Sequence, residues 1–395
     1  MTAAETLLGP LDPETRRALE TLPALIDKTF PLPARFRGGL KRDVAELSRL
    51  LTGGRGDRQT GYLEQRPLLS AYLRYFLPWN SYRLARLLPN LPLRLEPGDA
   101  VTDLGSGPLT FPIALWIARP DLRSIPLEFR CLDRTGAALD AGKQLFGALA
   151  GPSAAWTIRT ICGPIGKEVR GKPAALVSAL HVFNERYLDT RQGRAAAGYT
   201  LPLETIEREA RRLLSLAAAE GSILVMEPGI PRAGEFIALL RAVLINQGRF
   251  PLAPCPHAGT CPCPGGLDAR KGLDARKSKQ KWCHFAFDTE DAPPELLRLS
   301  AAAGLPKERA VLSFLLAGPE KALGPPQTAG DLPVRILSDL FALPGGRYGR
   351  YGCSAAGLAL AAGARAAAEQ AAPGTLLWSS AADRGRRDPK TGAVM

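Results

Sequence analysis

The sequence predicts an α/β protein. A helical region precedes the strands of its sheet in the sequence, and a cysteine-rich insertion follows them. Short apolar runs alternate with helically spaced segments over residues 96–250, and strands separated by helices favour a parallel sheet with right-handed crossovers. The next stretch breaks this alternation with cysteine, proline and lysine. We expect five regions: an N-terminal helical domain (1–95), the core (96–250), a Cys-rich insertion with a basic loop (251–290), the end of the core with the C-terminal region (291–375), and a flexible basic tail (376–395).

The composition is that of a globular chain with a basic balance. Of the 395 residues, 46% are hydrophobic and 23% are charged, and the net charge is +13. No apolar run reaches the ~18 residues of a membrane span, and no secretory signal is visible. We therefore expect a cytoplasmic protein without a membrane partner. The charge favours a polyanionic partner such as nucleic acid, and the alternative is a basic surface without such a role. A DNA partner is not expected.

The first region shows helix starts and amphipathic spacing. Asp12-Pro13-Glu14 is a typical helix start, with a capping Asp followed by Pro and an acid in the first turn. Residues 35–51 place apolar side chains on one helical face. Residues 72–83 mix aromatic side chains with arginine. We expect this stretch to pack the helices against the next domain, and stacking on RNA bases is the alternative.

The rest of the chain is assigned from apolar runs and helical spacing. We expect strands over residues 99–104, 127–132, 156–161, 174–180, 223–226, 309–316 and 334–337. We expect helices over residues 112–118, 137–149, 203–214, 233–245 and 354–372. The basic runs 265–281 and 384–390 are expected to be solvated.

A glycine-rich turn follows the first predicted strand. Its residues Asp103, Gly105, Ser106 and Gly107 form an acid followed by a G-x-G loop, and Asp133 ends the second strand. Such loop amides meet an anionic group, and an acid after the second strand holds ribose hydroxyls. The third glycine of the dinucleotide fingerprint is missing, so the pattern favours S-adenosylmethionine. Another nucleotide and a purely structural turn are the alternatives.

Polar residues also follow the fourth predicted strand. His181, Asn184 and Glu185 stand where side chains of an open α/β sheet line the ligand crevice. They are the candidate catalytic residues, and a strand-capping role for His181 is the alternative. The Pro- and Gly-rich loop 227–234 follows the fifth strand and borders the acceptor side or only shapes the turn.

Five of the seven cysteines fall between positions 255 and 353. In a cytosolic protein of this length such cysteines favour a metal site over disulfides. The Cys-Pro pairs are typical of iron–sulfur ligands, whereas His257 and His284 beside the cysteines keep zinc open. We expect the remaining two, Cys131 and Cys162, to be buried, inert thiols.

Several motifs together resemble the methyltransferase-like family of small-ribosomal-subunit assembly proteins. They are DLGSGPLT (103–110), HVFNE (181–185), LVMEPGIPRAGEFI (224–237), CPHAGTCPCP (255–264) and WCHF (282–285). The resemblance implies a Rossmann-like S-adenosylmethionine methyltransferase core that binds small-subunit rRNA and carries a 4Fe–4S cluster. On the family's motifs, Asp103, Gly105 and Gly107 match the cofactor loop, and the implied cluster ligands are Cys255, Cys261, Cys283 and Cys353. Cys263 departs from the pattern and either replaces Cys283 or is a bystander.

Two functions follow from these motifs. No Asn-Pro-Pro-Tyr loop and no Pro-Cys pair stands after the fourth strand, where HVFNE is found. Alignment and desolvation of the acceptor alone support methyl transfer, so this does not exclude an enzyme. The favoured function is an rRNA-binding assembly or translation factor of the small subunit. The alternatives are an active S-adenosylmethionine-dependent rRNA methyltransferase and a zinc-stabilised methyltransferase with another substrate.

Overall fold

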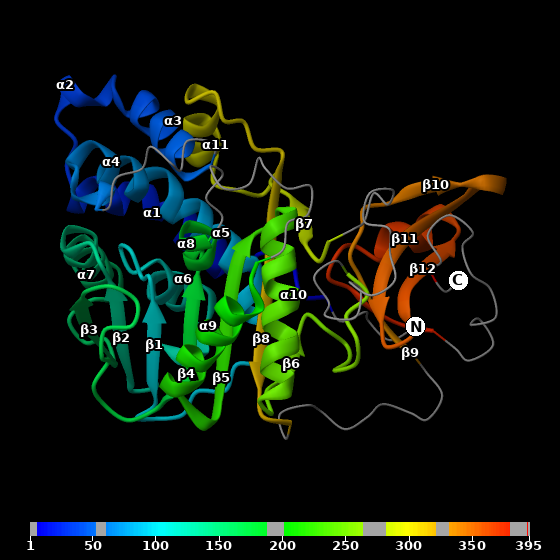
Figure 1. Ribbon diagram of the computed structural model, residues 1–395. Coiled ribbons are helices and arrows are strands. Elements are labelled where there is room, and N and C mark those ends of the chain that lie inside the picture. Colours follow the sequence, from blue (N-terminus) through cyan, green and yellow to red (C-terminus); the bar gives the residue numbers. More distant parts are fainter. Residues whose placement is uncertain are drawn as a thin grey trace.

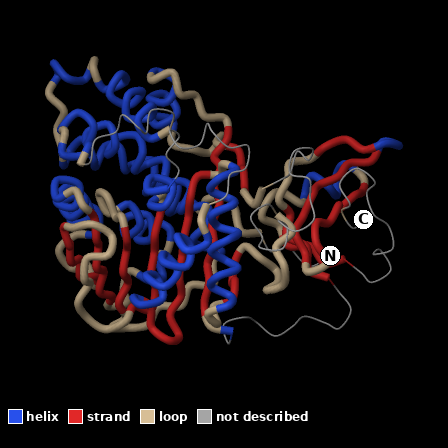
Figure 2. The backbone as a smooth tube through the Cα atoms, in the orientation of Figure 1, coloured by secondary structure: helices blue, strands red, loops and turns tan. Residues whose placement is uncertain are grey.

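The computed structural model describes residues 6–52, 61–187, 201–263, 282–320, 332–379 and Ala393. An eight-stranded sheet with helices on both faces forms the larger part, and a smaller unit made mostly of strands lies beside it (Figures 1 and 2). The basic runs 265–281 and 384–390 lie outside the described residues.

The large sheet has the strand order β3-β2-β1-β4-β5-β8-β6, and β7 also pairs with β8. Its strands are β1 (Ala100–Leu104), β2 (Leu127–Asp133), β3 (Trp156–Cys162), β4 (Ala174–Leu180), β5 (Ala217–Pro228), β6 (Phe250–Ala253), β7 (Phe285–Asp288) and β8 (Arg309–Gly318). The order reverses between β1 and β4, which makes the sheet doubly wound.

The parallel sheet expected over residues 96–250 is confirmed for β1 to β5, but the strand that follows at 309–318 reverses direction. Strands β1 to β5 pair in parallel, whereas β8 runs antiparallel to β5, β6 and β7. The apolar run at 309–316 indicated a strand, but an apolar strand buried on both faces carries no mark of its direction. The sheet is therefore mixed.

Helices cover both faces because successive residues of the strands point to opposite sides. They are α6 (Thr110–Ala118), α7 (Gly136–Ala150), α8 (Val182–Tyr187), α9 (Leu203–Leu216), α10 (Pro231–Asn246) and α11 (Pro294–Ala302). One apolar cluster joins α8, α9 and α10 to side chains such as Val177 and Val225. The neighbouring Leu176 and Leu224 belong to the cluster on the other face, with α6, α7 and the N-terminal helices.

The N-terminal helices are α1 (Pro13–Thr29), α2 (Ala34–Arg37), α3 (Leu40–Leu51), α4 (Arg66–Ala71), the π-helical turn Tyr72–Phe76 and α5 (Leu77–Leu87). Asp12 caps α1 as predicted, since its Oδ1 accepts hydrogen bonds from the amides of Glu14 and Thr15 at 2.9 Å. The single helix expected over residues 35–51 is interrupted at Gly38-Gly39, where two glycines in succession disfavour a helix.

The aromatic stretch after α4 packs inside the protein, as expected. Tyr75, Trp79 and Tyr82 are buried. The Trp79 Nε1 donates to Ser300 Oγ of α11 at 3.0 Å, which joins α5 to the far end of the core. These rings therefore hold the N-terminal helices on the sheet layer, and they are closed to a nucleic acid.

The smaller unit is a five-stranded antiparallel sheet. It consists of β9 (Leu332–Ile336), β10 (Phe341–Leu343), β11 (Arg347–Ser354), β12 (Gly357–Gly363) and β13 (Leu376–Ser379), with the short helix α12 (Arg365–Gln370). The helix expected over residues 354–372 is confirmed only for α12 and is wrong for residues 354–363, because β11 and β12 form a hairpin there. Pairing of β12 along β11 outweighs the helix preference of its alanines. The expected tail begins later than residue 376, since β13 pairs with β9.

Two further observations complete the fold. The N-terminal segment reaches the small unit, where the Leu7 amide donates to the Gly374 carbonyl at 3.1 Å and Thr6 bridges Thr375. No helix among the described residues is both long and apolar enough to cross a membrane.

The buried Trp79 gives a test of how the helices are held. We expect Trp79→Ala to lower the free energy of unfolding by about 3–5 kcal/mol, because it leaves a large cavity. Ser300→Ala, which removes only the hydrogen-bond partner of the indole, is expected to cost about 1 kcal/mol. Denaturant unfolding of both variants measures this, and equal losses would contradict the packing role of the ring.

Candidate functional sites

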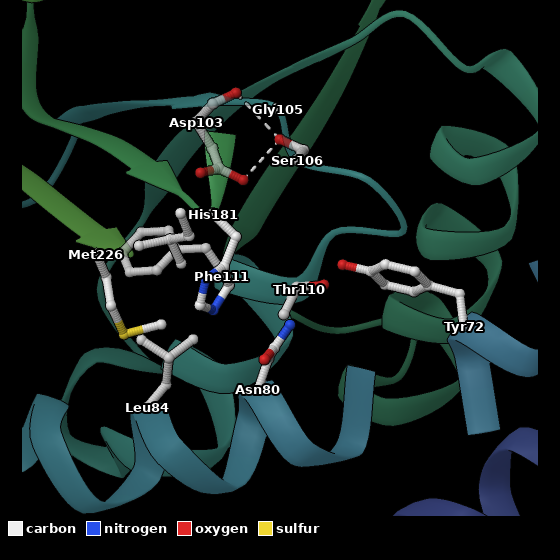
Figure 3. A pocket seen from close by; sticks show the side chains of 11 residues that line it. Tyr72, Asn80, Leu84, Asp103, Gly105, Ser106, Thr110, Phe111, His181 and Met226 are labelled. Carbon is white, nitrogen blue, oxygen red and sulfur yellow. Dashed lines mark hydrogen bonds between the residues drawn. The ribbon is translucent and has the colours of Figure 1, made fainter. Parts of the chain in front are cut away.

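The first candidate site lies at the carboxyl ends of β1 and β4, where the strand order reverses. Open α/β sheets bind ligands in the crevice outside this point. The structure brings Asp103 of β1, Asp133 of β2 and His181 after β4 to this edge. The loop carrying Gly105 and Gly107 lies between them and α6, as Figure 3 shows for part of this site.

Asp103 is fully engaged by hydroxyl groups. Its side chain is 1% exposed. The Oδ1 accepts from Ser178 Oγ and the Oδ2 from Ser106 Oγ, each at 2.6 Å. Burial raises the pKa of Asp103 from 3.8 to about 7, and the two hydroxyl bonds only partly offset this. The carboxyl group therefore holds the loop to β4 through these two serines and does not face solvent.

The glycines of the loop allow close packing as well as a tight turn. Gly105 and Gly107 have φ of +69° and +52°. A Cβ on Gly105 would lie 2.4 Å from Val182 Cγ2 of α8. Glycine is thus required at position 105 by the protein's own packing, whatever ligand the loop meets.

Asp133 is also occupied by the chain itself. Its Oδ2 accepts from the Gly107 amide at 2.8 Å and its Oδ1 from the Thr135 amide at 2.9 Å. Burial raises the pKa of Asp133 against the lowering effect of these amides. The acid expected to hold a ribose therefore ties the glycine loop to the start of α7.

His181 is strained and lacks a partner. Its φ of +59° lies in the left-handed region, which is rare for a side chain of this size. Its Nε2 is buried without a hydrogen bond, as is Oδ1 of Asn184. Burial lowers the pKa of His181 to about 3, so the ring is neutral. Both groups have hydrogen-bonding capacity to offer a ligand. Glu185 is half-buried at the same helix start.

Sequence reasoning passed over Glu227, which positions these residues. This buried acid at the end of β5 accepts hydrogen bonds from the amides of Phe183 and Asn184 at 2.8 and 3.0 Å. It thereby caps the N-terminus of α8, where a negative charge is favoured. The EPGxPR run contained the signal, since an acid that ends a buried strand needs a partner.

The crevice itself is filled by side chains. The cavity measures about 10 Å³, which is room for one water molecule. Figure 3 shows Tyr72, Asn80 and Leu84 reaching from the N-terminal helices toward Thr110 and Met226. The N-terminal helices therefore close the crevice from above, a contribution that no motif indicated.

The second candidate site surrounds the cysteines after β6. The segment is held by arginines on two sides. Arg241 of α10 donates from Nη2 to the carbonyls of His257 and Gly259 at 2.7 and 2.8 Å. Arg335 of β9 donates from Nε to the Pro254 carbonyl at 3.1 Å. Guanidinium groups bound to main-chain oxygens fix the path of this loop between the core and the small unit.

The five cysteines of this site are close enough to affect one another. Burial raises the pKa of Cys353, and Cys255, Cys261 and Cys283 raise it further. Cys263 has a raised pKa because its thiol is hydrogen-bonded to those of Cys261 and Cys283. The pKa of Cys261 is lowered to about 7 by Cys263. His257 Nε2 also lies 3.3 Å from Cys353 Sγ.

The EPGIPRAG and WCHF motifs pack against each other here. A Cβ on Gly234 of α10 would lie 2.9 Å from Trp282 Cδ1. The Trp282 indole donates to the Gly229 carbonyl at 3.1 Å. The glycines of the EPGIPRAG run therefore make the surface on which the WCHF segment, and with it Cys283, is seated.

The thiols do not outline a single-ion site. Within the described ranges, no three or more His, Cys, Asp or Glu side chains are arranged as ligands of one metal ion. The metal at this site stays a prediction. Of the two remaining thiols, Cys131 is buried as expected. Cys162 is exposed, contrary to the expectation, because it is the last residue of the edge strand β3.

The raised pKa of Asp103 gives a pH test of the first site. The unfolded carboxyl loses its proton near 3.8 and the folded one near 7. In this window the unfolded state binds fewer protons, so the contribution of Asp103 to stability is lost as pH rises. We expect Asp103→Asn, which stays neutral, to gain stability relative to the native protein between pH ~4 and ~7. Urea unfolding across this range measures it, and parallel stability curves would contradict the raised pKa.

Comparison with known proteins gives weak structural likenesses. A methyltransferase from Thiobacillus denitrificans, solved with S-adenosylhomocysteine, is 16% identical, with 62% of this chain and 92% of that chain covered and a TM-score of 0.31. One from Geobacter sulfurreducens is 18% identical, with 62% and 91% covered and a TM-score of 0.31. Geranyl diphosphate C-methyltransferase from Streptomyces coelicolor is 10% identical, with 66% and 85% covered and a TM-score of 0.32.

The fold assignment rests on the strand order of the sheet, which gives the chain a Rossmann-like α/β core of the methyltransferase kind. No curated protein matches the sequence significantly. The model of the family described as mitochondrial small ribosomal subunit Rsm22 matches residues 198–321. That range contains the EPGIPRAG, CPHAGTCPCP and WCHF motifs, and the match confirms the resemblance to the methyltransferase-like small-subunit family.

Proposed function

We propose that this protein is an rRNA-binding assembly or translation factor of the small ribosomal subunit that uses a methyltransferase-like fold as a scaffold. The observation that carries the proposal is the filled crevice at the carboxyl ends of β1 and β4. The family match over residues 198–321 and the net charge of +13 support a ribosomal RNA partner.

S-adenosylmethionine does not fit the crevice in this conformation. Sites for ligands of this size measure about 300–1,000 Å³, whereas the cavity here measures about 10 Å³. The acids that would meet the cofactor are bonded to the chain, Asp103 to two serines and Asp133 to two backbone amides. Binding would require the N-terminal helices to withdraw Tyr72, Asn80 and Leu84.

A second candidate, an S-adenosylmethionine-dependent rRNA methyltransferase, is favoured by one observation. His181 holds a strained backbone and an unpartnered buried Nε2 at the crevice wall. Strain and unpaired polar groups tend to gather at functional sites. Candidate residues for that activity remain His181, Asn184 and Glu185.

One experiment separates the two candidates. We expect the purified chain to bind small-subunit rRNA, with log K falling linearly with log salt because phosphate contacts release counterions. If the protein acts only by binding, we expect no methyl group to enter the RNA when labelled S-adenosylmethionine is present. Filter binding and methyl counting on the same samples measure both quantities.

If the RNA gains methyl groups and this gain is lost in Asp103→Ala, the protein is a methyltransferase and the proposal of a binding factor is wrong. Asp103→Ala removes the acceptor of the two serine hydroxyls, and Asp121→Ala, at an exposed acid outside the crevice, is the matched control. Absence of rRNA binding at low salt would overturn the proposal itself.

We also propose that Cys255, Cys261, Cys283 and Cys353 hold a 4Fe–4S cluster, with zinc as the alternative metal. The donor set fits, because soft thiolates are the ligands of both, and these four thiols lie within electrostatic reach of one another. The cluster supplies iron–thiolate bonds that cross-link segments. Arg241 and Arg335 hold the cysteine segment in place through its main-chain carbonyls.

The cluster proposal is tested by metal analysis. We expect anaerobically purified protein to contain about four iron and four sulfide per chain. Cys255→Ser should lower both and weaken rRNA binding, because the segment loses its cross-link to the small unit. Cys162→Ser, at an exposed thiol on β3, is the matched control.

One zinc ion per chain without sulfide would show that the metal is zinc and that the cluster proposal is wrong. Unchanged RNA affinity in Cys255→Ser would show that RNA binding does not depend on the metal. Cys263→Ser decides whether that thiol is a ligand or a bystander. We propose cytoplasmic action on the ribosomal subunit, as the sequence predicts.

A further inference from the structure

A second cavity lies at the seam between the large sheet and the small unit. Its volume is about 190 Å³, and neither candidate function uses it. Its walls come from the WCHF segment, from β7, from the β9–β10 connection and from β11 and β12. The cavity is therefore built by residues from both parts of the protein.

Aromatic rings dominate its lining. Trp282 and His284 are stacked, with ring centroids 4.6 Å apart and planes inclined by 20°. Phe341 and Tyr351 form a second stacked pair at 4.9 Å and 26°. All four side chains are partly exposed. In a folded core such pairs are usually closed off, whereas here both pairs line one open cavity.

Two of the rings are held by hydrogen bonds at their edges, and the backbone of a third is fixed. The Trp282 indole donates to the Gly229 carbonyl at 3.1 Å. His284 Nδ1 lies 3.0 Å from the Trp282 carbonyl. The Tyr351 amide donates to Ser338 Oγ at 2.8 Å. The planes are thus positioned in advance, and little ordering is needed when a flat ligand enters.

The charged groups beside the cavity are paired with one another. Asp339 at the rim is held by two hydrogen bonds from the Arg309 guanidinium, at 2.5 and 2.6 Å. Arg350 donates from Nη1 to the Ser338 carbonyl at 3.1 Å. Asp288 also lies 3.9 Å from Arg309, so the arginines beside the cavity are balanced by neighbouring carboxylates and the recognition is left to the rings.

We propose that this cavity receives an unstacked nucleobase of single-stranded RNA. Proteins that recognise single-stranded RNA stack splayed-out bases on aromatic side chains beside a positive surface. A cavity of this volume lined by flat rings matches a base and is too small for a folded peptide element. The inference rests on the proposed rRNA binding and names the contact through which one base is held.

The test uses the full chain, with its metal content checked, and a fluorescent single-stranded RNA of about 12 nucleotides. We expect Phe341→Ala to weaken binding by about tenfold, the loss typical of one stacked base. Trp378→Ala, which removes an exposed ring of β13 outside the cavity, should bind as the native protein does.

Ultraviolet cross-linking of the unaltered protein gives a readout that does not depend on a variant folding. We expect cross-linked nucleotides on peptides that contain Trp282, Phe341 or Tyr351. Cross-links confined to other peptides, or native affinity in Phe341→Ala, would overturn the base pocket while leaving rRNA binding intact. Failure of the unaltered chain to bind any RNA would overturn the proposed function as well.

Discussion

The seating of the cysteine segment on α10 is the constraint on which both halves of the molecule depend. Gly234 leaves room for Trp282, the Gly229 carbonyl accepts from its indole, and Arg241 binds the carbonyls of the loop before it. A side chain at Gly234 would displace this segment. Because Cys283 and the first ring of the seam cavity belong to it, the predicted metal site and the proposed base pocket share one support.

In this structure the crevice at the edge of the parallel strands is closed by the protein's own side chains. The two acids that would meet a cofactor are instead bonded within the protein, and two hydroxyls offset part of the cost of burying Asp103. The N-terminal helices complete this closure with side chains of α5. The scaffold is thereby stiffened at the place where relatives of this fold class keep a ligand.

Much of the core could be predicted from the sequence, because apolar runs of strand length and helical spacing reflect burial directly. The strands at 127–132 and 174–180 are examples. The small antiparallel unit could not, since short strands rich in alanine and glycine, such as Gly357–Gly363, gain their structure from cross-strand partners far along the chain. The direction of β8 depends on the same kind of distant pairing.

The candidate site residues divide in a similar way. Motifs located the glycine loop and the cysteines, because backbone turns and soft ligands demand particular residue types. The stretch 72–83 indicated packing against the next domain, but its letters did not show that Tyr72 and Asn80 would fill the crevice. The roles of Glu227 and Arg241 depend on main-chain groups that the sequence letters do not reveal.

The bridge between Thr6 and Thr375 sets an order of events during synthesis. The segment around Leu7 leaves the ribosome early, but its partner at Gly374 is translated only after the whole large sheet and β9 to β12. The last strand β13 pairs with β9 beside this bridge. Closure of the small unit therefore comes last, after domains that fold as they emerge have formed. During synthesis the segment around Leu7 therefore stays without this partner until residues 374 and 375 have been made.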